Sequence, residues 1–233
     1  DLSNPGLVGA IVTDEVNEGK ITSSSIGYEL TNDSRLYKSG QKNGFLLKVG
    51  QQFSGLGGDN TGLKTLIMAA AQREAFKEEV KFSAVVEAGV LTYTSGNSRV
   101  TDRFFLSSNK MRGFEPGGLG PRECSNKLCG TGTNDALGGE SFTVLRLEAE
   151  FPFGLPEEYG LSGGVFYDIG NVWSLSKVND NVLYEAGSWR HSVGASIFWK
   201  TPIGPLRFNF TEALEKELYD KDESFDLTIS TRF

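Results

Sequence analysis

The chain has 233 residues, and its 16 Phe, 7 Tyr and 3 Trp exclude an intrinsically disordered protein, which would have few aromatic side chains. No window approaches the about 18 consecutive apolar residues of a transmembrane helix, so a helical membrane protein is also excluded. The formal net charge of −7 leaves no general basic surface, and we expect no nucleic-acid partner.

A weak apolar stretch at residues 7–12 precedes the first clear strand signal. It is either a tenth strand or part of a loop, and residues 1–20 are therefore interpreted as a partial loop or the remnant of a strand. Nine strand signals follow, and helical periodicity is nearly absent. The expected strands cover residues 21–30, 44–53, 63–72, 80–93, 142–151, 161–173, 190–201, 206–211 and 225–233.

Apolar and polar side chains alternate along several of these segments. In the fourth segment, Val80, Phe82 and Val86 fall on one face, whereas Lys81 and Glu87 fall on the other. The segments 190–201 and 225–233 alternate in the same way. A period of two predicts strands with one apolar face and one polar face.

The connections between the strands alternate in length. Longer loops are expected at residues 94–141, 174–189 and 212–224, and short turns separate most of the other strands. This arrangement, with strands of about 10 residues, is typical of an antiparallel all-β transmembrane barrel in an outer membrane. A soluble all-β barrel or sandwich is the alternative. Because bacterial barrels usually have an even number of strands, nine strands indicate an incomplete piece of a barrel.

The longest loop carries an arginine at the tip of a glycine-rich hairpin, in the sequence Met111-Arg112-Gly113-Phe114. An arginine inside a barrel needs carboxylate partners that can accept its forked donors. Strand alternation places two candidates on polar faces, Glu148 and Asp168. The alternative is that Arg112 is a solvated loop residue.

Two cysteines, Cys124 and Cys129, lie within the same loop. Either they form a local disulfide in an oxidising compartment or they are two reduced surface thiols; no second Cys or His pair completes a zinc site. The single histidine, His191, falls on an apolar face, and no nucleophile motif is present. We therefore expect no catalytic residue, no metal and no cofactor, and the protein is not expected to be an enzyme.

Four segments together resemble the BamA family of outer-membrane assembly factors, in particular its alphaproteobacterial members. They are FFLSSNKMRGFEPGGLGPR at 104–122, DALGG at 135–139, VFYDIGNVW at 165–173 and TPIGPLRF at 201–208. The resemblance covers residues 21–233 and implies the last nine strands of a sixteen-stranded barrel, without the periplasmic POTRA domains. It also implies that the loop 94–141 folds into the lumen, where the tip Arg112, Gly113 and Phe114 packs against Glu148 and Asp168.

The resemblance implies the central insertase of outer-membrane protein assembly, which templates client barrels on a strand edge at a lateral seam. One side of that seam is the last strand, with Phe225, Leu227, Ile229, Ser230 and Phe233. Ser230 stands where relatives often have a glycine that helps the strand to kink, which puts a kink at this position in doubt. The implied partners are unfolded outer-membrane proteins, accessory lipoproteins, and outer-membrane lipid and lipopolysaccharide.

Four other functions share part of the pattern. A TamA-like assembly factor or a two-partner polypeptide-secretion transporter carries a similar arginine-glycine tip on its loop. A passive porin uses a long loop to constrict its pore, and an adhesive surface barrel uses long loops to bind an external ligand.

Overall fold

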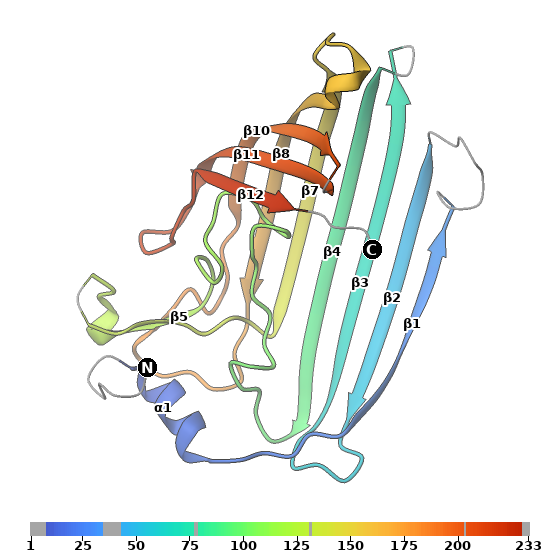
Figure 1. The fold of residues 1–233 in the computed structure, drawn as a ribbon. Helices are drawn as coiled ribbons and strands as arrows, with labels where there is room; N and C mark the ends of the chain where they lie inside the picture. The colour runs from blue at the N-terminus through green and yellow to red at the C-terminus, as the bar shows by residue number, and fades with distance from the viewer. Residues whose placement is uncertain (1–7, 35–42, 77–78, 131, 203, 230–233) are drawn as a thin grey trace.

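The computed structural model describes residues 8–34, 43–76, 79–130, 132–202 and 204–229. Nearly all of its regular elements are strands (Figure 1). In chain order they are α1 (Ala10–Asn17), β1 (Ser25–Asp33), β2 (Gly44–Ser54), β3 (Thr61–Ala75), β4 (Val80–Ser95), β5 (Arg122–Cys124), η1 (Ser125–Lys127), β6 (Asn134–Ala136), β7 (Ser141–Pro152), η2 (Glu157–Tyr159), β8 (Leu161–Trp173), β9 (Val182–Leu183), β10 (Arg190–Thr201), β11 (Gly204–Glu215) and β12 (Phe225–Ile229).

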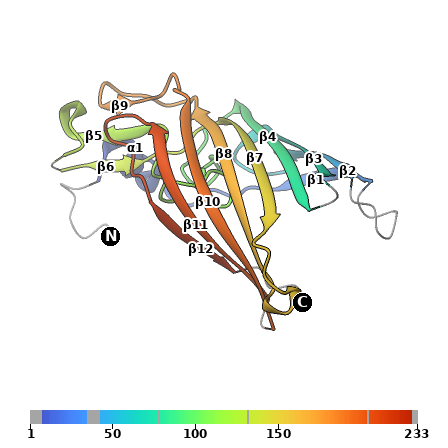
Figure 2. The ribbon, with the colours of Figure 1, turned by 90° about the horizontal axis from the view of Figure 1, so that it is seen from above.

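Nine strands of the described part of the chain form one antiparallel sheet in the order β1-β2-β3-β4-β7-β8-β10-β11-β12. The sheet is strongly curved and does not close, because β1 and β12 are its two edges (Figures 1 and 2). The predicted antiparallel all-β barrel fold is therefore confirmed, with the barrel left open. No helix in the described part of the chain is long and apolar enough to cross a bilayer.

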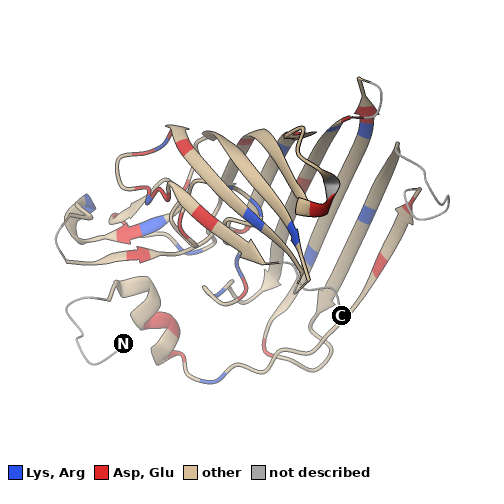
Figure 3. Cartoon of the chain, turned by 45° about the horizontal axis from the view of Figure 1, so that its top comes forward, with Lys and Arg blue, Asp and Glu red and all other residues tan. Residues whose placement is uncertain are grey.

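The two faces of the sheet differ in the way that the alternation predicts. Leu30, Val86, Val165 and Phe210 are among the large apolar side chains exposed on the convex face. The registers between neighbouring strands place the residues that alternate with these apolar side chains on the concave face. A sandwich would bury those apolar residues between two sheets, so their exposure excludes the sandwich. Charged residues form a minority along the strands (Figure 3).

The concave face is not uniformly polar. It holds a buried apolar cluster in which the loop between β4 and β7 packs against inward-facing residues of the sheet. The members are Leu91, Phe104, Leu106, Met111, Phe114, Leu119, Phe142, Val144 and Val172. This cluster fixes the loop inside the curved sheet.

Residues 10–17 form α1, so a tenth strand is wrong for residues 10–12; the other interpretation, part of a loop, stays a prediction. The helix depends on distant partners. The Glu123 carboxylate accepts hydrogen bonds from the backbone amides of Ala10 (3.0 Å) and Ile11 (2.9 Å), which have no partner within the helix. Ile11 then packs against Leu137 and Leu175. Tertiary contacts therefore override the weak local strand signal.

The long loops contain a second, smaller sheet that the sequence analysis did not predict. Its strand order is β6-β5-β9, with β5 and β6 from the loop before β7 and β9 from the loop before β10. We call α1 and this small sheet the cap. It lies at one end of the curved sheet (Figure 1).

Candidate functional site

The tip of the loop between β4 and β7 lies on the concave face, where Arg112 makes a buried ion pair. Its Nε and Nη2 donate to the two carboxylate oxygens of Asp168 at 2.7 and 2.5 Å. Its Nη1 donates to Glu148 at 2.5 Å, and its guanidinium lies 3.6 Å from the centre of the Phe166 ring. Arg112 is only 5% exposed and Asp168 is fully buried, so the pair is shielded from water. The structure thus brings together the arginine and both predicted carboxylates, and Arg112 is not a solvated loop residue.

Strand register explains why these side chains converge. In the β7–β8 pair, Arg146 lies opposite Asp168 and Glu148 lies opposite Phe166, so all four side chains point to the concave face. Two carboxylates from adjacent strands therefore flank the place that Arg112 occupies. A bidentate arginine between two carboxylates compensates buried charges that would be costly alone.

Gly113 lets the chain turn directly after the arginine. Its φ angle is +89°, which favours glycine, and an added Cβ would lie 2.6 Å from the Cγ2 atom of Thr211 and 3.2 Å from the Cβ atom of Ser192. Ser192 also donates its hydroxyl to the Arg112 carbonyl at 2.7 Å. A side chain at position 113 would move the tip away from β10 and β11.

Phe114 is buried in the apolar cluster together with Met111. The glycine that makes room for Met111 was not predicted from the sequence. Gly170 faces the same cluster, and a Cβ there would collide with the Met111 sulfur and approach Leu106 and Val144. The signal was present in the segment 165–173, where a glycine interrupts an inward-facing series of larger residues.

The tip also pairs with the connection between β11 and β12. The Glu115 amide donates to the Lys221 carbonyl at 3.0 Å, and the Lys221 amide donates to the Gly118 carbonyl at 2.8 Å. The Glu223 amide donates to the Gly113 carbonyl at 3.0 Å. The loop is therefore attached by its backbone to the segment that leads into β12.

The predicted seam strand is described as β12. Phe225, Leu227 and Ile229 lie on the convex face and are about half exposed, as the alternation predicts. β12 pairs with β11, and among the described residues no strand pairs with its other edge. Ser230 and Phe233 lie outside the described residues.

The cap surrounds the other predicted pair of residues, Cys124 and Cys129, which form a disulfide. Beside it, the buried Arg122 donates to the Gly117 carbonyl at 3.0 Å. Burial lowers the pKa of Arg122 from its ordinary value, while the nearby Asp220 carboxylate acts in the opposite direction. The disulfide therefore lies in a densely hydrogen-bonded part of the cap.

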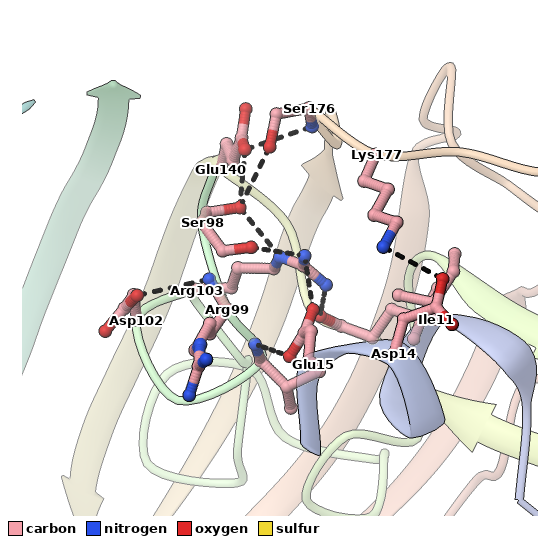
Figure 4. A network of polar contacts seen from close by, with 12 residues as sticks. Ile11, Asp14, Glu15, Ser98, Arg99, Asp102, Arg103, Glu140, Ser176 and Lys177 are labelled. Atoms are coloured by element: carbon pink, nitrogen blue, oxygen red, sulfur yellow. Dashed lines mark hydrogen bonds and ion pairs between the residues drawn. The ribbon is translucent and has the colours of Figure 1, made fainter. Parts of the chain in front are cut away.

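A second buried ion pair fixes α1 to the loop (Figure 4). Arg103 donates to Glu15 at 2.8 Å and to the hydroxyl and carbonyl oxygens of Ser98 at 2.9 and 2.6 Å. Ser98 in turn donates to Glu140 at 2.5 Å. Figure 4 shows these groups converging from α1 and from the loop between β4 and β7. None of these residues was predicted from the sequence, because the partners are up to 88 residues apart.

Within the described residues, no group of three or more His, Cys, Asp or Glu side chains is arranged to hold a metal ion. His191 lies on the convex face, where its Nδ1 is 2.6 Å from the Tyr167 hydroxyl. The geometry is that of a structural brace between a loop, a sheet and an edge strand.

Comparison with known proteins shows the family of the chain. The model of the Omp85 superfamily domain matches residues 4–233. The chain belongs to the Omp85 superfamily. Among curated Omp85 relatives, the outer membrane protein assembly factor BamA of Neorickettsia risticii is 33% identical over 191 residues, covering 82% of this chain and 24% of that protein. The sorting and assembly machinery component 50 homolog of Bos taurus is 29% identical, covering 76% of this chain and 38% of that protein.

A solved Omp85 structure has the same fold. The crystal structure of BamA from Haemophilus ducreyi, lacking POTRA domains 1–3, superposes with a TM-score of 0.71 at 19% identity, covering 88% of this chain and 41% of that chain. The resemblance inferred from the four motifs and the predicted location in an outer membrane are thus confirmed. The chain spans about a quarter of the length of the BamA relative from Neorickettsia.

Proposed function

We propose that this chain is part of an insertase that folds outer-membrane β-barrel proteins at the edge of its own sheet. The observation that carries the proposal is the attachment of the Arg112 tip to the sheet and to the segment before β12, whose outer edge has no partner among the described residues. The printed names of the relatives, which are assembly factors or components, support a role in assembly.

The proposed mechanism is physical and needs no covalent step, so the protein is not an enzyme. A client strand that enters the hydrocarbon layer exposes unpaired N–H and C=O groups, each of which costs several kcal/mol. Pairing with an exposed strand edge satisfies those groups and adds the client strand to the sheet. The client then grows strand by strand until it closes on itself.

Within this mechanism, Arg112, Gly113 and Phe114 hold the loop against the sheet. The ion pair with Asp168 and Glu148 fixes the tip, and the backbone pairs with residues 221–223 extend that constraint to the seam. The partners are unfolded outer-membrane proteins, accessory assembly lipoproteins, and the lipid and lipopolysaccharide around the convex face. The alternative within the superfamily is a TamA-like factor or a polypeptide-secretion transporter.

The test uses the full-length protein in lipid vesicles supplied with an unfolded β-barrel client. We expect Arg112→Ala to slow the appearance of folded client, measured by its heat-modifiable migration on a gel. The matched control is Lys48→Ala, which removes another inward-facing cation whose partner Glu29 is exposed, and it leaves the rate unchanged. Client assembly at the wild-type rate in Arg112→Ala would refute the proposed role of the tip.

Two further measurements separate the seam from other mechanisms. A photo-crosslinker at Leu227 in β12 is expected to capture the client, whereas one at Val165 on the same face in the middle of the sheet is not. In planar bilayers an insertase gives small and erratic conductance. Large and stable channels would instead indicate a porin.

A further inference from the structure

A continuous series of hydrogen bonds runs across the concave face from the loop tip to β12. Glu148 on β7 accepts from Arg112 at 2.5 Å and also from Arg207 on β11. The Arg207 Nε donates to the Asn209 side-chain oxygen at 2.7 Å. The Asn209 amide nitrogen then donates to the Asp226 carboxylate on β12 at 2.9 Å. These four contacts connect the loop, β7, β11 and β12.

Asn209 is a buried residue in the middle of this series of hydrogen bonds. It is 1% exposed, and its side-chain oxygen also accepts a hydrogen bond from Ser196 on β10 at 2.7 Å. A buried amide stays in one orientation when both its oxygen and its nitrogen are bonded, since each unpaired polar atom is costly. Asn209 therefore holds Asp226 at a defined place beside β11.

The side-chain hydrogen bond to Asn209 matters more for β12 than a similar bond would for a central strand, because β12 is a short edge strand. Its described part has five residues, and its apolar side chains point outward, where Phe225 makes one ring contact with Phe210 at 5.4 Å. The register places Asp226 opposite Asn209 and Thr228 opposite Arg207 on the concave face. Thr228 also donates to Asp226 at 3.1 Å. The polar side chains are thus the anchor of β12 on the concave face.

We propose that Arg207, Asn209 and Asp226 are positioning residues that set the place of the seam strand and couple it to the loop tip through Glu148. This inference rests on the proposed function, because it names the residues through which the loop would control the edge used for client pairing. Arg112 and Arg207 both donate to the Oε2 atom of Glu148, so a change at the tip reaches β12 through Arg207 and Asn209.

Hydrogen exchange of the full-length protein in lipid nanodiscs tests the inference. Asn209→Asp places two carboxylates opposite each other, and we expect amides 225–229 to exchange about tenfold faster, the size expected for one lost hydrogen bond to a charged group. The double variant Asn209→Asp with Asp226→Asn restores an amide and a carboxylate with exchanged places. The new carboxylate at position 209 still accepts from Arg207 and Ser196, while the new amide at position 226 donates to it. Exchange should then return to within about twofold of the wild type.

Two additional variants locate the effect. Arg207→Gln is expected to accelerate exchange at residues 225–229 and to leave the tip amides 111–115 protected, since Asp168 still holds Arg112. The matched control is Gln52→Leu, which removes an amide hydrogen bond between β1 and β2, from Gln52 to Ser25 at 2.6 Å. It should not change residues 225–229.

The outcomes separate this inference from the proposed function. Unchanged exchange at residues 225–229 in Asn209→Asp, no restoration in the double variant, or an equal effect of Gln52→Leu would overturn the coupling. Faster exchange with restoration supports it. If β12 is loosened in this way while client folding proceeds at the wild-type rate, the coupling stands and the proposed use of the seam is refuted.

Discussion

Replacing Arg112 by methionine tests how strongly the charged tip holds the loop. Methionine keeps a long unbranched side chain but removes the charge and all three side-chain hydrogen bonds to Asp168 and Glu148. Glu148 retains Arg207, whereas Asp168 is fully buried and loses the guanidinium fork that compensates its charge. Breaking one partner of a buried pair costs roughly 3–5 kcal/mol. We take the lower end of this range, about 3 kcal/mol, which raises the equilibrium for local opening more than about a hundredfold.

The assay is hydrogen exchange at amides 111–115 of the full-length protein in lipid, where local opening of the tip limits the rate. A second arm combines Arg112→Met with Asp168→Asn, which leaves no unpaired charge and keeps an acceptor for the residue 112 amide. We expect this double variant to recover about half of the lost protection, since removing both charges is cheaper than removing one. An effect of Arg112→Met below about 1 kcal/mol, or no recovery in the double variant, would refute the buried ion pair as the clamp.

Three other changes test the backbone of the tip and the cap. Gly113→Ala should destabilise the tip by about 2 kcal/mol, because it combines a positive φ with contact against a threonine methyl group of β11. The matched control is Gly57→Ala, at a glycine with φ +86° and open space around it. Equal effects of the two variants on thermal unfolding would contradict a steric role of the β11 contact. Replacing Cys124 and Cys129 by serine should lower the stability of the cap by about 2 kcal/mol in the chain-entropy model for so short a loop. We expect faster hydrogen exchange that is confined to the cap. Loss of the nine-stranded sheet, monitored by circular dichroism, would show that the disulfide does more than shape a loop. Glu15→Gln should weaken the attachment of α1 by about 2–3 kcal/mol, because the arginine partner of Glu15 keeps its charge in a buried place. Limited proteolysis near residue 18 measures this change. An unchanged cleavage rate would count against a structural role of the pair.

The sequence predicted most of the large sheet because each strand is in contact with lipid on one side. A single curved layer keeps the period of two visible, so the phase of alternation assigns each side chain to a face. That phase alone placed Glu148 and Asp168 on the concave face, and their register in the β7–β8 pair then brings them to one arginine. A layered soluble protein would blur this signal, because both faces of a central strand are then buried.

The cap and α1 could not be predicted in the same way, because their determinants are not local. α1 begins where Glu123, more than 110 residues away, accepts its first amide hydrogen bonds, and Arg103 and Glu15 meet across 88 residues. Its own eight residues have no acidic first turn and no capping side chain. A helix so short has little stability without such contacts.

The apolar cluster on the concave face changes the interpretation of the charged tip. An interior filled with water would screen Arg112 and make its ion pair weak. Here the buried Met111 and Phe114 lie one residue before and two residues after the arginine, and Arg112 and Asp168 are buried too, so the pair forms in a dry place where an unpartnered charge is costly. The apolar residues thus raise the free energy needed to release the arginine. The arginine in turn holds the apolar residues in a single position. We therefore expect Phe114→Ala to weaken the ion pair although it changes neither of the paired residues. Amides 111–115 should lose protection from hydrogen exchange in this variant, in which Arg112 and Asp168 are both present.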